Sequence, residues 1–190
     1  YTATLLKRQT GELSQLGKPQ SFKLKVLNNS PEISKDPQAV QDFHIQLAEM
    51  SRAVEGTNGK LGEMNNSVAH LYKALELTPS ADENLRKELD TIRDKLINFN
   101  TKLNGDSTIS SRAEPVPWPV SQRIGSLYGS IIESQSDVPQ GFKDSYEIAK
   151  SEFSSLIKEL KQIDDSLNAF EIEIESKDAP RSEEHTSELQ

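Results

Sequence analysis

The sequence predicts a mainly α fold: an elongated antiparallel helical bundle, with two long and two short helices packed as in a coiled coil, preceded by a β-hairpin remnant of a β-sandwich domain. Three observations support this class. Apolar residues recur at alternating spacings of three and four through most of residues 36–176. Capping and turn residues divide that region into four segments. Residues 1–30 show β-forming residues and a period of two instead.

Residues 1–30 are predicted to be the C-terminal strands of a truncated β-sandwich domain. Residues 1–6 are rich in β-forming side chains, and a polar connection with two glycines and a proline follows. Phe22, Leu24 and Val26 then alternate with polar residues, which indicates a strand with one face toward solvent. Because two strands alone are marginally stable in water, we expect them to be the last hairpin of a larger sheet.

The first helix is predicted from about residue 37 to residue 77. Asp36 is a favourable N-cap, and Pro37 suits the first helical position. Three glycines lie between residues 56 and 62, and each lowers helix stability by about 1 kcal/mol relative to alanine. The apolar spacing does not slip across them, so we expect one continuous helix that is weakened in its middle. The residues expected to face the core are Val40, Phe43, Leu47, Met50, Val54, Thr57, Leu61, Met64, Val68, Leu71 and Leu75.

A second helix is predicted after Pro79. Ser80 with Glu83 matches a capping box, and Asn104-Gly105 is a suitable end. Its expected core residues are Leu85, Leu89, Ile92, Leu96, Phe99 and Leu103.

Two further helices follow a polar loop predicted from Asp106 to Pro117. A short helix is expected from about Pro119, and Pro139 is expected to open the last helix. Their expected core residues are Val120, Ile124, Leu127 and Ile131, and then Phe142, Tyr146, Ala149, Phe153, Leu156, Leu160, Ile163, Leu167, Phe170 and Ile174. The two middle helices together match the length of either long helix. They could stack end to end as one broken leg or lie side by side as a fourth helix.

Catalytic, cofactor-binding and metal-binding residues are not recognisable in this sequence, which therefore predicts no enzyme in this segment. There is no cysteine, no nucleophile elbow and no phosphate-binding glycine loop. His44 and His70 lie far apart without a second ligand at helical spacing. A net charge of −8 disfavours nucleic acid and anionic lipid as partners, and no apolar run is long enough to span a membrane.

A proline-rich loop around Trp118 is the segment with most potential for interaction. Trp118 is the only tryptophan, and prolines on both sides of it reduce the entropy lost when the loop is fixed. Its indole could stack on a sugar or on a protein partner. Alternatively, it fills the end of the bundle or packs against the β-domain. Arg112 and Glu114 are expected to anchor the same loop to the helices by charged hydrogen bonds.

Several segments together resemble a known family. The segments that carry the resemblance are residues 1–5 and 17–22, Leu103-Asn104-Gly105-Asp106, Arg112-Ala113-Glu114-Pro115, Arg123-Ile124, Tyr146-Glu147-Ile148-Ala149 and Glu152-Phe153. They resemble the C-terminal region of bacterial sortilin-like, BNR/Asp-box-repeat β-propeller proteins, which are often labelled glycosyl hydrolases. The resemblance implies the C-terminal end of an exported multidomain protein, after a propeller and a β-sandwich. Hydrolytic residues would lie in the propeller, so none is carried over to this chain.

The expected function is a non-catalytic structural or interaction module that docks on its own upstream β-propeller or β-sandwich domains or on a second subunit. One alternative is an accessory part of a glycoside hydrolase that contributes to a carbohydrate cleft, and another is a free-standing helical partner-binding domain. Residues 177–190 are expected to form a disordered tail. Residues 181–190, which include Glu183, Glu184 and His185, resemble a translated sequencing adapter and are not interpreted as a metal site.

Overall fold

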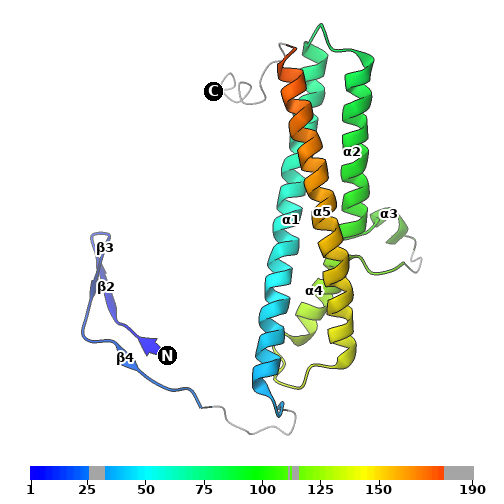
Figure 1. The fold of residues 1–190 in the computed structure, drawn as a ribbon. Coiled ribbons are helices and arrows are strands. Elements are labelled where there is room, and N and C mark those ends of the chain that lie inside the picture. The colour runs from blue at the N-terminus through cyan, green and yellow to red at the C-terminus, as the bar shows by residue number, and fades with distance from the viewer. Residues whose placement is uncertain (26–32, 111, 113–115, 178–190) are drawn as a thin grey trace. The chain divides into compact units, whose positions relative to one another are not determined.

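The computed structural model describes residues 1–25, 33–110, 112 and 116–177. The chain divides into two compact units, Tyr1–Ile33 and a second unit that begins at Ser34. The described residues confirm the predicted fold class, because a small β-hairpin region precedes a bundle of helices (Figure 1). Predictions for Glu114 and for residues 178–190 lie outside the described residues.

The first unit is a narrow antiparallel ribbon. Strand β1 (Thr2–Ala3) pairs with β4 (Gln20–Ser21), and β2 (Leu6–Gln9) pairs with β3 (Glu12–Gln15). The turn between β2 and β3 holds both Thr10 and Gly11 at positive φ, at 51° and 90°, as the tight turns of two-residue hairpins require. This hairpin corrects the sequence prediction, which took the segment for a polar connection because its strands carry few apolar residues.

The predicted strand from residue 21 to residue 26 is also corrected. In this region, Gln20–Ser21 forms a strand, residues 22–25 lie outside any strand, and Val26 is not among the described residues. Tyr1 and Phe22 still exchange two backbone hydrogen bonds, at 2.9 and 3.0 Å, and their rings stack at 5.8 Å. Every described residue from 1 to 25 is exposed, including Leu6 of β2 and Leu13 of β3. The ribbon therefore has no core of its own among the described residues.

The first long helix, α1 (Pro37–Leu77), is continuous, as predicted. The Asp36 carboxylate accepts a hydrogen bond from the backbone N–H of Ala39 at 3.1 Å, and Pro37 occupies the first turn. All eleven positions expected to face the core are buried, including Thr57. The Thr57 hydroxyl donates to the backbone carbonyl of Ala53 at 2.8 Å, which satisfies this polar group within its own helix.

Helix α2 (Glu83–Asn104) begins at a different cap from the one predicted. The Asp82 carboxylate accepts the backbone N–H groups of Asn84 and Leu85, both at 3.0 Å. Ser80 instead donates its hydroxyl proton to the carbonyl of Lys177, 97 positions away, at 3.1 Å. The capping box was therefore wrong, because Asp82 is an equally good N-cap that stands directly before the first helical residue. Gly105 ends the helix at a φ of 88°, as expected of a C-terminal glycine.

The segment after α2 contains more helix than predicted. A single turn, α3 (Ser107–Ser110), lies within the expected loop, and the Asp106 carboxylate accepts the backbone N–H of Thr108 at 2.8 Å. Helices α4 (Val120–Ile131) and α5 (Gln140–Glu175) follow near the predicted positions. Phe142 is only partly buried, unlike the other residues expected in the core of α5, because it lies in the first turn of that helix.

The helices form a three-legged bundle in which α2 and α4 together make one leg. Figure 1 shows α1 and α5 side by side and running in the same direction, with α2 beside one half of the pair and α4 beside the other half. Both short helices run opposite to the long ones. Gly105 and Pro119 meet where the two pieces adjoin, since a Cβ on Gly105 would lie 3.2 Å from the Pro119 Cγ. The end-to-end alternative is therefore the observed one.

Candidate functional site: a cleft where α2 and α4 meet

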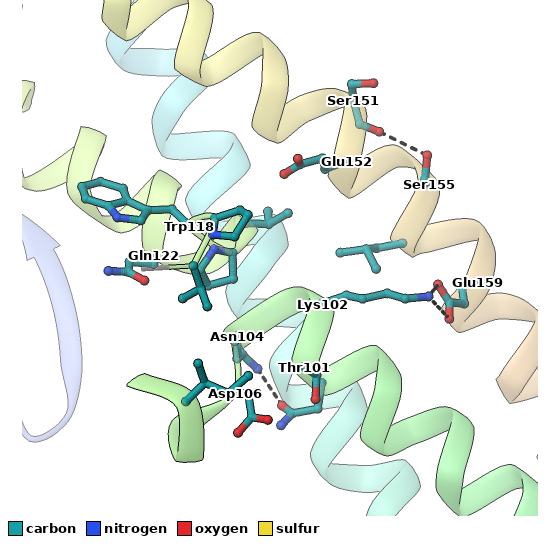
Figure 2. Close-up of a pocket in the computed structure, with 18 residues that line it drawn as sticks. Thr101, Lys102, Asn104, Asp106, Trp118, Gln122, Ser151, Glu152, Ser155 and Glu159 are labelled. Atoms are coloured by element: carbon teal, nitrogen blue, oxygen red, sulfur yellow. Dashed lines mark hydrogen bonds and ion pairs between the residues drawn. The ribbon is translucent and has the colours of Figure 1, made fainter. Parts of the chain in front are cut away.

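A cleft of about 890 Å³ lies where the leg of α2 and α4 is interrupted. This volume is within the range of ligand pockets, roughly 300–1,000 Å³. The last turn of α2 and the residues after it form one wall, which consists of Asn100, Thr101, Lys102, Asn104, Gly105, Asp106 and Ile109. Residues 116–120 and Gln122 form a second wall, and the face of α5 from Ser151 to Glu159 forms the third. The cleft thus joins segments that are far apart in the sequence (Figure 2).

Trp118 lies in this cleft and is 50 % exposed. Its backbone carbonyl accepts a hydrogen bond from Nη2 of Arg123 at 3.3 Å, which ties the loop to the first turn of α4. Figure 2 shows the indole near Gln122 and apart from the paired side chains of Lys102 and Glu159. The indole does not fill the core of the bundle, so a large aromatic surface is accessible to a ligand or partner.

The cleft surface formed by α2 and α5 is polar, and several of its side chains bond to other side chains of the bundle. Nζ of Lys102 contacts both carboxylate oxygens of Glu159, at 2.8 and 2.9 Å. The side-chain amide of Asn104 donates to Oδ1 of Asn58 and to Oδ1 of Asn100, both at 2.8 Å. These contacts join α2 to α5 and α2 to α1. They hold the wall in place while leaving amide and hydroxyl groups at the surface.

Two carboxylates complete the lining. The hydroxyl and backbone N–H of Thr108, at 2.6 and 2.8 Å, lower the pKa of Asp106 from its ordinary value, and the charge of Arg112 lowers it further. Asp106 is therefore an ionised acceptor at neutral pH. Glu152 is exposed on α5, and Figure 2 shows its side chain extending toward the loop that carries Trp118. Together the lining offers an aromatic face, amides and carboxylates, which are groups suited to recognition.

Of the residues predicted for this loop, the structure places Trp118 in the cleft and Arg112 beside it, within electrostatic range of Asp106. Glu114 lies outside the described residues. The guanidinium that holds the Trp118 carbonyl belongs to Arg123, which the sequence pointed to only as part of the family resemblance and not as an anchor of this loop. Its place in the first helical turn after Pro119 was the feature of the sequence that could have indicated this contact. The Lys102–Glu159 pair had none, because 57 positions separate the two residues.

Metal-binding and membrane-spanning features are absent from the part of the chain that the structure describes. No group of three or more His, Cys, Asp or Glu side chains is arranged to hold a metal ion there. His44 has Nε2 buried without a hydrogen-bond partner, and His70 is exposed farther along the same helix. None of the described helices combines the length and the apolar character needed to cross a membrane.

Comparisons with protein families, with curated proteins and with solved structures found no match to this chain.

Proposed function

We propose that this chain is a non-catalytic structural or interaction module of a larger exported protein. In this proposal the helical bundle is a C-terminal appendage, and the ribbon is the end of a β-sandwich domain. The observation that carries it is the contrast between the two units. The bundle buries a continuous apolar core of its own, whereas the apolar side chains of the ribbon that are described between residues 1 and 25 are all exposed.

The ribbon supports the proposal because it is too small to be stable alone. Leu5, Leu13 and Leu24 are each about two-thirds exposed, at 68 %, 66 % and 66 %. Isolated two-stranded hairpins are at best marginally stable in water, and three or more strands with an apolar face are needed for stability. The apolar side chains of the ribbon therefore need a cover, and further strands of a sandwich domain would supply both that cover and pairing partners.

Hydrogen exchange of the ribbon amides tests this proposal. We expect residues 2–21 to exchange at nearly unprotected rates in the present chain, and to become protected in a longer chain that includes the upstream sequence. The bundle amides serve as the internal control, since they should be protected in both. Equal protection of the ribbon in both chains would contradict the proposal. Asp-box repeats in the upstream sequence would support the propeller parent and export.

Docking of the bundle on another domain or subunit would use apolar residues outside the core. Large aliphatic residues exposed on the described helices include Ile45, Leu77, Ile97, Ile148, Ile157 and Ile172. Removing the bundle from the full-length parent is expected to change its oligomeric state or its thermal stability. Light scattering and calorimetry measure these two properties, and no change in either would exclude the docking role.

A second candidate function is carbohydrate binding in the cleft, as an accessory part of a glycoside hydrolase. The half-exposed indole of Trp118 beside amides and carboxylates favours it, because aromatic faces stack on sugars and planar polar groups bind their hydroxyls. A glycan array with the intact chain tests it. We expect Trp118→Ala to abolish binding, while Tyr128→Ala, an exposed aromatic on α4 outside the cleft, should not. If the unsubstituted chain binds no glycan, this candidate is excluded.

A third candidate is a free-standing helical partner-binding domain. The division of the chain at Ser34 and the separate core of the bundle favour it. It predicts that residues 34–177 alone unfold cooperatively, with the same midpoint as the intact chain. Loss of cooperative unfolding in that fragment would exclude it.

A further inference from the structure

We propose that the bundle bends at one level along its length, and that this bending changes the width of the cleft. We call this level the waist. It comprises residues 56–62 of α1, the junction of Gly105 with Pro119, and residues 151–159 of α5. The inference goes beyond the proposed function and does not depend on it.

Contacts between the helices place these segments at the same level. Asn104, the last residue of α2, donates to Oδ1 of Asn58 on α1 at 2.8 Å. Nζ of Lys102, on the last turn of α2, lies 2.8 Å from Oε1 of Glu159 on α5. Each long helix is thus connected to the end of α2 by side chains within the waist.

The first weakness at the waist is the break in the third leg. Helix α2 ends at Gly105, whose φ of 88° turns the chain away from the helix axis, and α4 begins only at Val120. Because a helix resists bending through its continuous backbone hydrogen bonds, a leg made of two pieces offers little resistance where they adjoin.

The second weakness lies in α1. A Cβ on Gly56, Gly59 or Gly62 would meet nothing within 4 Å, so packing does not require glycine at any of the three positions. Glycine has the lowest helix propensity of any residue except proline. The same segment holds Thr57, the polar residue in an otherwise apolar row of core positions. The waist therefore combines a flexible backbone with a small polar side chain in the core.

The third weakness is in α5, which crosses the waist unbroken. Ser154 and Ser155 donate their hydroxyl protons to the carbonyls of Lys150 and Ser151, at 2.7 and 3.3 Å. Serine hydroxyls that bond to the carbonyl one turn earlier slightly destabilise helices and often bend them. All three legs thus carry a weakening feature at the waist. A serine of the same kind, Ser166, also lies on α5 beyond the waist, so the waist is distinguished by the coincidence of the three features at one level.

The cleft has walls on both sides of the waist. Lys102 lies on α2 in one half, whereas Trp118 and Gln122 belong to the loop and the helix of the other half (Figure 2). A bend at the waist moves these walls relative to each other, so the width of the cleft follows the bend.

Spin-label distance measurements test the bending. The chain contains no cysteine, so pairs of labels can be introduced without removing native thiols. One pair spans the waist, with labels at exposed Gln46 on α1 and exposed Asn98 on α2. A second pair, at exposed Glu88 on α2 and exposed Asn168 on α5, lies within one half and reports the breadth expected without bending.

We expect a broader distance distribution for the pair across the waist than for the pair within one half. Replacing all three waist glycines by alanine is expected to narrow the first distribution toward the breadth of the second. Gly125→Ala with Gly129→Ala in α4 is the matched control, because those glycines also have open space around them but lie outside the waist. This control should leave the distribution unchanged.

Equal breadth for both pairs in the chain with its native glycines would overturn the proposal. So would a triple variant that keeps the broad distribution, or a control that narrows it equally. Circular dichroism verifies that each variant retains its helices, and Gly59→Ala alone provides a milder variant with a smaller expected narrowing.

Discussion

Replacing Gly56, Gly59 and Gly62 of α1 by alanine is expected to stabilise the protein. Alanine is favoured over glycine by about 1 kcal/mol at each interior helix position. Nothing lies within 4 Å of the added Cβ at any of the three sites, so no clash reduces this gain. The added methyl groups also contact no core residue, so burial contributes little. The free energy of unfolding should therefore rise by about 2–3 kcal/mol for the triple variant.

Thermal unfolding followed by circular dichroism measures this gain. In a protein of this size each kcal/mol moves the midpoint by about 2–4 °C, so we expect an increase of roughly 5–10 °C. Urea unfolding gives the free energy independently, and an unchanged dependence on urea concentration would show that the folded state remains as compact.

Gly105→Ala serves as a control, because the same criteria of helix propensity and available space predict a loss of stability there. Its φ of 88° is unfavourable for alanine, and the new Cβ would lie 3.2 Å from the Pro119 Cγ. We expect a loss of about 1 kcal/mol or more. An unchanged or lowered midpoint in the triple variant, or a Gly105→Ala variant as stable as the native chain, would refute the argument from helix propensity and space.

Three further predictions address the core, a cap and a titrating group. Phe99 is 0 % exposed, so Phe99→Ala should lower the free energy of unfolding by about 3–5 kcal/mol in urea titrations. Asp82→Ala should lower the thermal midpoint more than Ser80→Ala, because Asp82 caps α2 and Ser80 does not. A larger decrease for Ser80→Ala would instead favour Ser80 as the N-cap. Burial, followed by the hydrogen bond to Asp90, raises the pKa of Tyr72 from 10.0 to about 12. The neutral hydroxyl therefore stabilises the fold fully below pH 10, and this stabilisation is lost as the pH rises through 12. In unfolding experiments at increasing pH, the difference in free energy of unfolding between the native chain and Tyr72→Phe should therefore decrease between pH 10 and pH 12.

The helices could be predicted because one physical requirement determines them. A long helix buries a stripe only if apolar residues recur at spacings near 3.5, and the row from Val40 to Leu75 meets this requirement throughout. A continuous helix could be predicted in spite of Thr57 and three glycines, because the alternating spacing of the apolar residues is the same on both sides of them. Phe142 shows the limit of this reasoning, since periodicity does not reveal where along a helix the neighbouring helices end.

The ribbon and the helix caps were less accessible to sequence reasoning. The hairpin of β2 and β3 buries nothing, so it lacks the apolar alternation by which strands are recognised. At the start of α2, Ser80 and Asp82 are both acceptable caps, and local sequence does not choose between them. In the structure the Ser80 hydroxyl donates a hydrogen bond to the distant carbonyl of Lys177, and Asp82 caps the helix.

The cleft was only partly predictable. Trp118 stood out by its residue type and its neighbouring prolines. The other walls come from α2 and α5, and the contact between Lys102 and Glu159 joins positions 57 apart. Such a pairing follows from how the helices are aligned lengthwise, and that alignment is set by packing along the whole bundle.

The chain runs along the long axis of the bundle three times: up along α1, back along α2 and α4, and up again along α5. An odd number of crossings places the start of α1 and the end of α5 at opposite poles, whereas an even number would bring them back together. Helices of 41 and 36 residues measure about 55–60 Å at 1.5 Å per residue. Groups attached at the two poles of the bundle would therefore lie roughly that distance apart, rather than side by side.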